Sequence, residues 1–128
     1  MKLFFFPVFV LLLLWSCSPT QKATSAHGHP VIKNDSTEYG IIITDIDFEN
    51  WYMLHFSPAK DHSNEYYRGK NQAAVSNWNI YFTDGSYHQA IDDYIYYDNS
   101  IDYGIEVNRK LYWYFNFVED NYRIRLFN

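Results

Sequence analysis

Residues 67–85, with the sequence YRGKNQAAVSNWNIYFTDG, carry the pattern that decides the fold of this chain. Apolar and amide side chains recur there at spacings of three and four residues, which is typical of one face of an α-helix. That face consists of Tyr67, Asn71, Ala74, Val75, Trp78, Tyr81 and Phe82. Capping groups at residues 61–64 and the pair Asp84-Gly85 predict where the helix begins and ends. An alternative stays open, because residues 78–82 also alternate into Asp-Gly, which is typical of a β-hairpin.

Residues 103–122 repeat the helical spacing further along the chain. The face predicted there consists of Ile105, Asn108, Leu111, Tyr112, Phe115, Val118 and Tyr122. Apolar residues between 105 and 117 also alternate, so a strand stays open as an alternative. The stretch 87–97 between the two predicted helices has no single pattern, and a short helix is one interpretation of it.

The two ends of the folded region favour strands. The β-branched run Ile41-Ile42-Ile43 predicts a buried strand over residues 39–44. Residues 123–127 (RIRLF) alternate and predict a closing strand, which we expect to pair with the first one because a lone strand leaves its backbone groups unpaired.

A short helix is predicted between the first strand and the long helix. Asp47 can cap it, and Phe48, Trp51, Tyr52 and His55 follow at helical spacing. Ser57-Pro58 should close it, because a residue before proline disfavours the α conformation. Together these elements predict a small single α+β domain, with two or three helices packed on a sheet formed by N- and C-terminal strands.

The first seventeen residues indicate export and lipidation. Met1-Lys2 is followed by an apolar run over residues 3–15, which as a helix would span about 20 Å, too short for a bilayer core of about 30 Å. Leu14-Trp15-Ser16-Cys17 resembles a bacterial lipoprotein signal, in which the cysteine is acylated. We therefore expect a signal peptide over residues 1–16 and a membrane anchor at Cys17.

Residues 17–37 are predicted to form a lipid-anchored flexible tether, with the globular domain over residues 38–128. The tether is rich in serine and threonine and has no aromatic residue, so it buries little apolar surface. Ser18 follows the cysteine in place of the aspartate typical of inner-membrane retention, which favours the periplasmic face of the outer membrane. His27-Gly28-His29 lies in this range, and we interpret both histidines as incidental.

Composition excludes several classes of function. The net charge of −5 opposes binding to nucleic acid, whose phosphates require clustered positive charge. One cysteine excludes an intramolecular disulfide, and no motif predicts a cofactor, a catalytic serine or a phosphate loop.

Aromatic motifs along the folded region are similar to those of a known family. They are Tyr66-Tyr67, Trp78-Asn79, Ile101-Asp102-Tyr103-Gly104, Leu111-Tyr112, Tyr114-Phe115, Phe117, Glu119 and Tyr122. In these motifs the chain resembles a family of small Bacteroidetes lipoproteins described as a domain of unknown function. The resemblance implies a location in the bacterial envelope and supplies no activity.

The acidic stretch between the two long predicted helices offers a candidate cation site at Asp92, Asp93, Asp98 and Asp102. An EF-hand is excluded, because Tyr103 and Arg109 stand where that loop requires glycine and glutamate. Solvated capping aspartates are the simpler interpretation. A small hydrolase that uses paired carboxylates among these residues is a weaker alternative, because glycoside hydrolysis needs two of them across a cleft.

Surplus aromatic residues supply the candidate binding surface. Rings at Tyr94, Tyr96, Tyr97, Tyr112, Trp113 and Tyr114 fall on more than one face of any regular element. Partly exposed tyrosine and tryptophan suit protein interfaces and sugar stacking, although they can also complete a small core. The sequence therefore predicts a non-catalytic envelope lipoprotein that binds or supports another envelope protein, with a glycan-binding module as the alternative.

Overall fold

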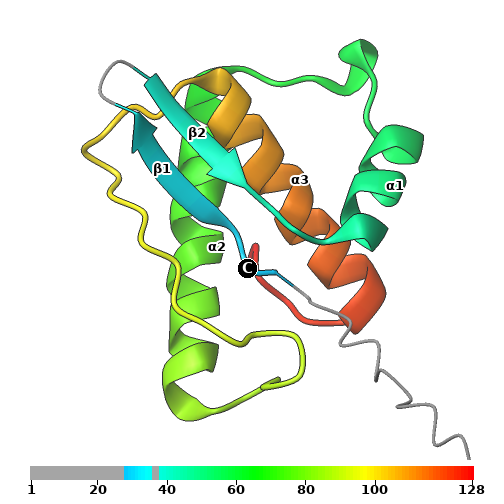
Figure 1. Ribbon diagram of the computed structural model, residues 1–128, viewed down its shortest axis with the longest axis vertical. Coiled ribbons are helices and arrows are strands. Elements are labelled where there is room, and N and C mark those ends of the chain that lie inside the picture. The colour runs from blue at the N-terminus through cyan, green and yellow to red at the C-terminus, as the bar shows by residue number, and fades with distance from the viewer. Residues whose placement is uncertain (1–27, 36–37) are drawn as a thin grey trace, which may run out of the picture.

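Three helices and a two-stranded antiparallel sheet make up the fold of the computed structural model, which describes residues 28–35 and 38–128. The elements are β1 (Val31–Asp35), β2 (Glu38–Ile42), α1 (Ile46–His55), a 3₁₀ turn (Pro58–Lys60), α2 (Asn64–Asp84) and α3 (Ile105–Tyr122). The sheet lies over the upper ends of α2 and α3, and α1 lies on the other side of α3 from α2 (Figure 1). The predicted α+β class is confirmed.

Helix α2 forms as its spacing predicts. The Ser63 side chain caps it by accepting a hydrogen bond from the Tyr66 N–H at 3.2 Å. Gly85 ends it with φ of 76°, a left-handed conformation that glycine adopts without a Cβ clash. The hairpin alternative for residues 78–82 is wrong, because this stretch continues the helix and buries Trp78 completely.

Helix α3 is the central element of the fold. It packs against α2, α1 and β2, so it is covered on more than one side. Its buried residues are Val107, Asn108, Leu111, Tyr114, Phe115, Phe117 and Val118. This wide buried surface explains why the stretch also looked like a strand from its alternation. The strand alternative is wrong.

The sheet is an N-terminal hairpin that pairs Val31 with Ile42 and Asp35 with Glu38. Strand β1 lies within residues 17–37, which the sequence assigned to the tether, so that boundary is wrong and the folded part begins before Glu38. The polar composition of this range hid a strand whose backbone groups are satisfied by β2.

The predicted C-terminal strand is wrong as well. Residues 123–128 are irregular, yet Ile124 and Leu126 are buried. Side chains, not a sheet partner, satisfy this backbone: Glu119 accepts from the N–H groups of Leu126 at 2.6 Å and Phe127 at 3.0 Å. The Asn77 amide donates to the Leu126 carbonyl at 2.8 Å, and the Tyr81 hydroxyl to the Arg125 carbonyl at 3.0 Å.

Helix α1 presents one buried aromatic face to α3. Its cap is Asp45 and not the predicted Asp47, because the Asp45 carboxylate accepts from the Phe48 N–H at 3.1 Å. Phe48 is fully buried, and Trp51 and Tyr52 on the same face pack against the core. The chain leaves the helix before Ser57-Pro58, as predicted.

Residues 85–104, which we call the return segment, run back along α2 and let α3 start beside the beginning of α2 (Figure 1). Three hydrogen bonds fix this antiparallel path: Asn79 to the Ile95 carbonyl, Arg68 to the Asn99 carbonyl, and Asn64 to Asp102. The segment consists of turns and extended chain, so a helix over residues 87–97 is wrong.

No helix in residues 28–35 and 38–128 combines the length and the apolar character required to cross a membrane. The predicted signal peptide and Cys17 lie outside the described residues.

Candidate functional site

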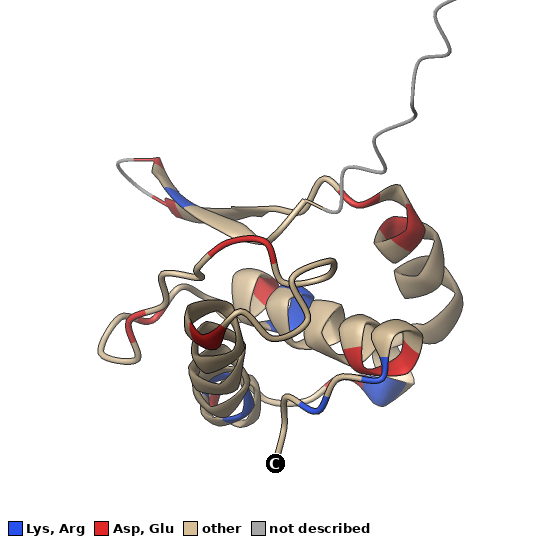
Figure 2. Ribbon diagram, turned by 90° about the horizontal axis from the view of Figure 1, so that it is seen from below, with Lys and Arg blue, Asp and Glu red and all other residues tan. Residues whose placement is uncertain are grey.

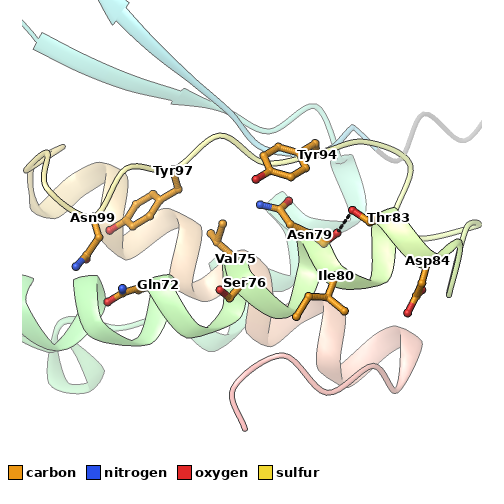
Figure 3. Close-up of a pocket in the computed structure, with 10 residues that line it drawn as sticks. All are labelled: Gln72, Val75, Ser76, Asn79, Ile80, Thr83, Asp84, Tyr94, Tyr97 and Asn99. Carbon is orange, nitrogen blue, oxygen red and sulfur yellow. Dashed lines mark hydrogen bonds between the residues drawn. The ribbon is translucent and has the colours of Figure 1, made fainter.

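An open groove runs between α2 and the return segment, with a volume of about 610 Å³ (Figure 3). Its walls are formed by Gln72, Val75, Ser76, Asn79, Ile80, Thr83 and Asp84 of α2 and by Tyr94, Tyr97 and Asn99 of the return segment. The volume lies within the range of small-ligand sites, which is about 300–1,000 Å³.

Asn79 fixes the return segment at this groove. Its amide donates to the Ile95 carbonyl and accepts from the Ile95 N–H, each at 2.9 Å. The Trp78 indole N–H donates to the Asp93 carbonyl at 2.8 Å, so the backbone is held on both sides of Tyr94. These three bonds give an irregular stretch the fixed main-chain partners that a sheet would otherwise supply.

Extended backbone at Ile95 places the neighbouring tyrosines outside. Ile95 is 1% exposed, whereas Tyr94 is 39% and Tyr96 is 82% exposed. Successive side chains of extended chain point to opposite sides, so burial of Ile95 forces both tyrosine rings outward. Their ring centroids lie 4.9 Å apart, and together they form an exposed aromatic pair, which we call the Tyr94–Tyr96 pair.

Tyr97 is anchored at the interior end of the groove. Its hydroxyl donates to the Asn108 side-chain oxygen at 2.9 Å, and burial raises the pKa of Tyr97 to about 12. Asn108 in turn donates to Asn64 at 2.9 Å, and Asn71 donates to the Asn108 carbonyl at 2.8 Å. This amide network joins α2, α3 and the return segment.

The groove lining is mostly uncharged and mixes polar and apolar surface. Most of its residues carry an amide or a hydroxyl group, apolar atoms make up the larger share of the exposed lining, and Asp84 is the one carboxylate among the lining residues. Hydrogen bonds from the hydroxyl and N–H of Ser86 hold the pKa of Asp84 below its ordinary value. Such a lining can offer hydrogen bonds and ring faces to a polar ligand.

The predicted aromatic surface divides into two groups. Tyr94 and Tyr97 line the groove, whereas the exposed Tyr96 lines a separate hollow beside His29 and β1 and meets the groove only through its contact with Tyr94. Tyr114 is 2% exposed, with its ring centroid 5.3 Å from that of Phe48, so its predicted role in an interface is wrong.

Tyr112 and Trp113 are half-buried and lie away from the groove. The Tyr112 ring lies 5.2 Å from that of Phe127, and the Trp113 ring lies 5.6 Å from that of Phe56. Both residues close the core around α3, because neighbouring elements cover this helix on several sides.

The four predicted acidic residues do not converge. The Asp98 carboxylate accepts from the N–H and hydroxyl of Ser100, and these bonds lower its pKa. The Asn64 amide and the Gly104 N–H donate to Asp102, lowering its pKa as well. In the described part of the chain, no group of three or more histidine, cysteine or acidic side chains is placed to hold a metal ion.

Asp92 and Asp93 instead face a histidine that the sequence assigned to the tether. Nδ1 of His29 lies 3.5 Å from Asp92 and Nε2 lies 3.2 Å from Asp93. His29 therefore links the segment before β1 to the return segment and is not incidental, while His27 lies outside the described residues. Acidic positions along the return segment are visible in Figure 2.

The sequence did not reveal a partly exposed ion pair between Arg109 and Asp61. Arg109 of α3 binds both carboxylate oxygens of Asp61, at 2.9 and 2.7 Å, and the Tyr67 hydroxyl donates to the same carboxylate at 2.5 Å. These bonds, with that of Arg109 foremost, lower the pKa of Asp61 to about 2. No local signal links two residues 48 positions apart, so only the fold reveals the pair.

Fold and groove together define a small α+β domain with an open, aromatic-edged groove. The chain belongs to the family of unknown function DUF6146, which it matches over residues 3–128. No curated protein and no solved structure matches the chain.

Proposed function

We propose that the protein is a bacterial envelope lipoprotein that binds another envelope protein without catalysing a reaction. The anchor is Cys17, supported by the apolar leader and by Leu14-Trp15-Ser16-Cys17. Acyl chains on this cysteine contribute about 0.8 kcal/mol for each buried methylene, so two or three chains hold the protein permanently. Ser18 supports placement at the periplasmic face of the outer membrane.

The Tyr94–Tyr96 pair is the observation that carries the binding proposal. Tyrosine is large, has few rotatable bonds and combines an apolar ring with a hydroxyl, which suits it to the centre of interfaces. Tyr96 is 82% exposed and makes no contribution to the core, yet Asn79 and Trp78 fix the backbone on which it stands. An exposed ring on a rigid support loses little freedom when a partner binds it.

Binding is favoured over catalysis by the chemistry of the groove. Glycoside hydrolysis requires two carboxyl groups across a cleft, and the lining of this groove supplies one, Asp84. The acidic residues of the return segment have structural partners in His29, Ser100 and Asn64.

A glycan is the second candidate ligand, favoured by the same lining. Amide and hydroxyl groups, including Gln72, Ser76 and Asn79, stand beside exposed tyrosine faces. Sugars present hydroxyl groups and flat C–H faces that such a surface can bind.

Site-specific photocrosslinking in intact cells tests the partner. A photoreactive phenylalanine at position 96 should capture one envelope protein reproducibly, because the side chain there is exposed beside the groove. The same group at position 66 is a matched control, since Tyr66 is 38% exposed and lies outside the groove. Absence of an adduct at position 96, or the same adducts at both positions, would contradict the proposal.

Co-sedimentation with purified peptidoglycan tests the glycan candidate. Binding that falls in Tyr94→Ala and Tyr96→Ala but persists in Tyr66→Ala would support it, because Tyr94 and Tyr66 are exposed to nearly the same extent, 39% and 38%. Equal binding by all three variants would exclude a role for the groove in glycan binding.

A further inference from the structure

The outer side of α1 carries three exposed apolar side chains. Ile46 and Met53 are each 78% exposed and Leu54 is 83% exposed. Spacings of seven and eight residues place them on the side of the helix away from Phe48, with Ile46 two turns before Met53 and Leu54 and the exposed Asn50 between them. We call these three residues the α1 outer face.

Isolated apolar residues on a surface are normal, whereas several large ones exposed on a single short helix are candidates for a contact. The opposite side of α1 already packs on the core through Phe48, Trp51 and Tyr52. Large apolar side chains therefore stand on two sides of the helix although the fold covers only one.

The start of the described chain lies beside this helix. A Cβ atom on Gly28 would collide with the Thr44 side chain, so the two residues are in close contact. Thr44 directly precedes Asp45, which caps α1. The described chain therefore begins near the end of α1 where Ile46 stands.

The intervening chain is short enough to keep the helix at the membrane. Ten residues lie between Cys17 and Gly28, so the distance from one to the other is at most about 40 Å. A lipid anchor at Cys17 thus gives the α1 outer face a high effective concentration at the bilayer, where three apolar side chains suffice for contact.

We infer that the α1 outer face docks onto the bilayer surface that holds the acylated Cys17. The inference rests on the proposed lipid anchor. Asp47 and Glu49 flank the face, and the net charge is −5, so the surface it fits is zwitterionic and not anionic. Glu49 is already paired with Lys110, at 2.7 Å.

Docking of α1 would turn the groove away from the membrane. Helix α3 packs against both α1 and α2, with α1 on one side and the return segment on the other (Figure 1).

Depth-dependent fluorescence quenching on the full lipidated protein tests the inference. Acylation blocks the sulfur of Cys17, so Leu54→Cys introduces a single free thiol for an environment-sensitive fluorophore. In phosphatidylcholine–phosphatidylethanolamine vesicles with nitroxide-labelled acyl chains, the label at position 54 should shift to the blue and be quenched. The matched control Ser76→Cys, on the exposed groove wall, should show neither change.

Ile46→Ser with Met53→Ser should reduce the quenching at position 54, while the protein still floats with the vesicles through its anchor. Equal, weak quenching at positions 54 and 76 in floating protein would overturn the docking of α1 and would leave the lipid anchor intact. A Leu54→Cys disulfide between two copies would overturn it in favour of a dimer contact. Protein that does not float would refute the anchor, and the docking with it.

Discussion

Glu119 shows how a single carboxylate can replace a sheet partner. It accepts the N–H groups of both Leu126 and Phe127, and so allows the tail to lie against α2 and α3 without a ladder. The Leu126 side chain is fully buried and Phe127 is half-buried, so water has limited access to these donors if the carboxylate is removed. The tail therefore depends on a residue seven positions earlier, in a different element.

Glu119→Ala should lower the free energy of unfolding by about 2 kcal/mol, because two partly buried N–H donors lose a charged acceptor. Urea unfolding checks this value. Asp120→Ala is the neighbouring control, and because Asp120 is exposed the change should stay within about 0.5 kcal/mol. Equal effects of the two substitutions would contradict the role given to Glu119.

Asp61 predicts a pH dependence of stability. Arg109 and Tyr67 bind the ionised carboxylate and lower its pKa from 3.8 to about 2. A carboxyl group whose pKa is lower in the folded state stabilises the fold above its unfolded pKa and loses that contribution as the pH falls towards the folded pKa. For a partly exposed pair the contribution is about 1 kcal/mol.

The difference in unfolding free energy between the wild type and Asp61→Asn should thus be constant above about pH 5. It should shrink between about pH 4 and pH 2, where the wild-type carboxylate takes up its proton. Urea unfolding across this range measures it. A difference that persists unchanged at pH 2 would show that the Arg109 pair does not depend on the charge of Asp61.

At the scale of elements, helices were predictable and irregular segments were not. Residues on the buried faces of α2 and α3 recur every three or four positions, so each helix carries its own signal. The return segment and the C-terminal tail have backbone partners such as Asn79 and Glu119, which lie on other elements. No local pattern reveals such partners, and alternation over residues 123–127 was therefore mistaken for a strand.

A substitution at Asn79 tests whether α2 holds the return segment in place at the candidate site. Asn79→Ala should remove both hydrogen bonds to Ile95 and lower the unfolding free energy by about 2 kcal/mol. Amide hydrogen exchange at Ile95 should rise while exchange in α3 stays slow. Ser76→Ala on the same wall is the control, and unchanged exchange at Ile95 in Asn79→Ala would contradict the account.

Part of the candidate site was visible in the sequence. The dense tyrosines of residues 94–97 stood out by composition alone, and the structure places Tyr94 and Tyr97 at the groove and Tyr96 beside it. The groove itself was not predictable, because its other wall belongs to a helix some twenty residues earlier. Tyr114 was assigned to a surface because three adjacent aromatic residues cannot share one helix face; this argument fails where a helix is covered on several sides.

At the scale of the whole molecule, a substitution at Tyr96 should abolish binding of the partner without changing the stability of the fold. Tyr96→Ala removes a side chain that is 82% exposed, so the unfolding free energy should change by less than about 0.5 kcal/mol. Capture of the envelope partner should nevertheless be lost, because the exposed ring forms the proposed contact. Pull-down from solubilised envelopes and urea unfolding on the same variant check both statements. A fully retained partner would place the interface elsewhere.

The most direct measurement of the central claim is intact-mass and N-terminal peptide mass spectrometry of the protein isolated from bacterial membranes. The account predicts that the mature chain begins at Cys17, and that this residue carries a diacylglyceryl thioether and an acylated amine. A chain that retains residues 1–16, or that has a free thiol at position 17, would contradict the lipid anchor and every proposal that rests on it.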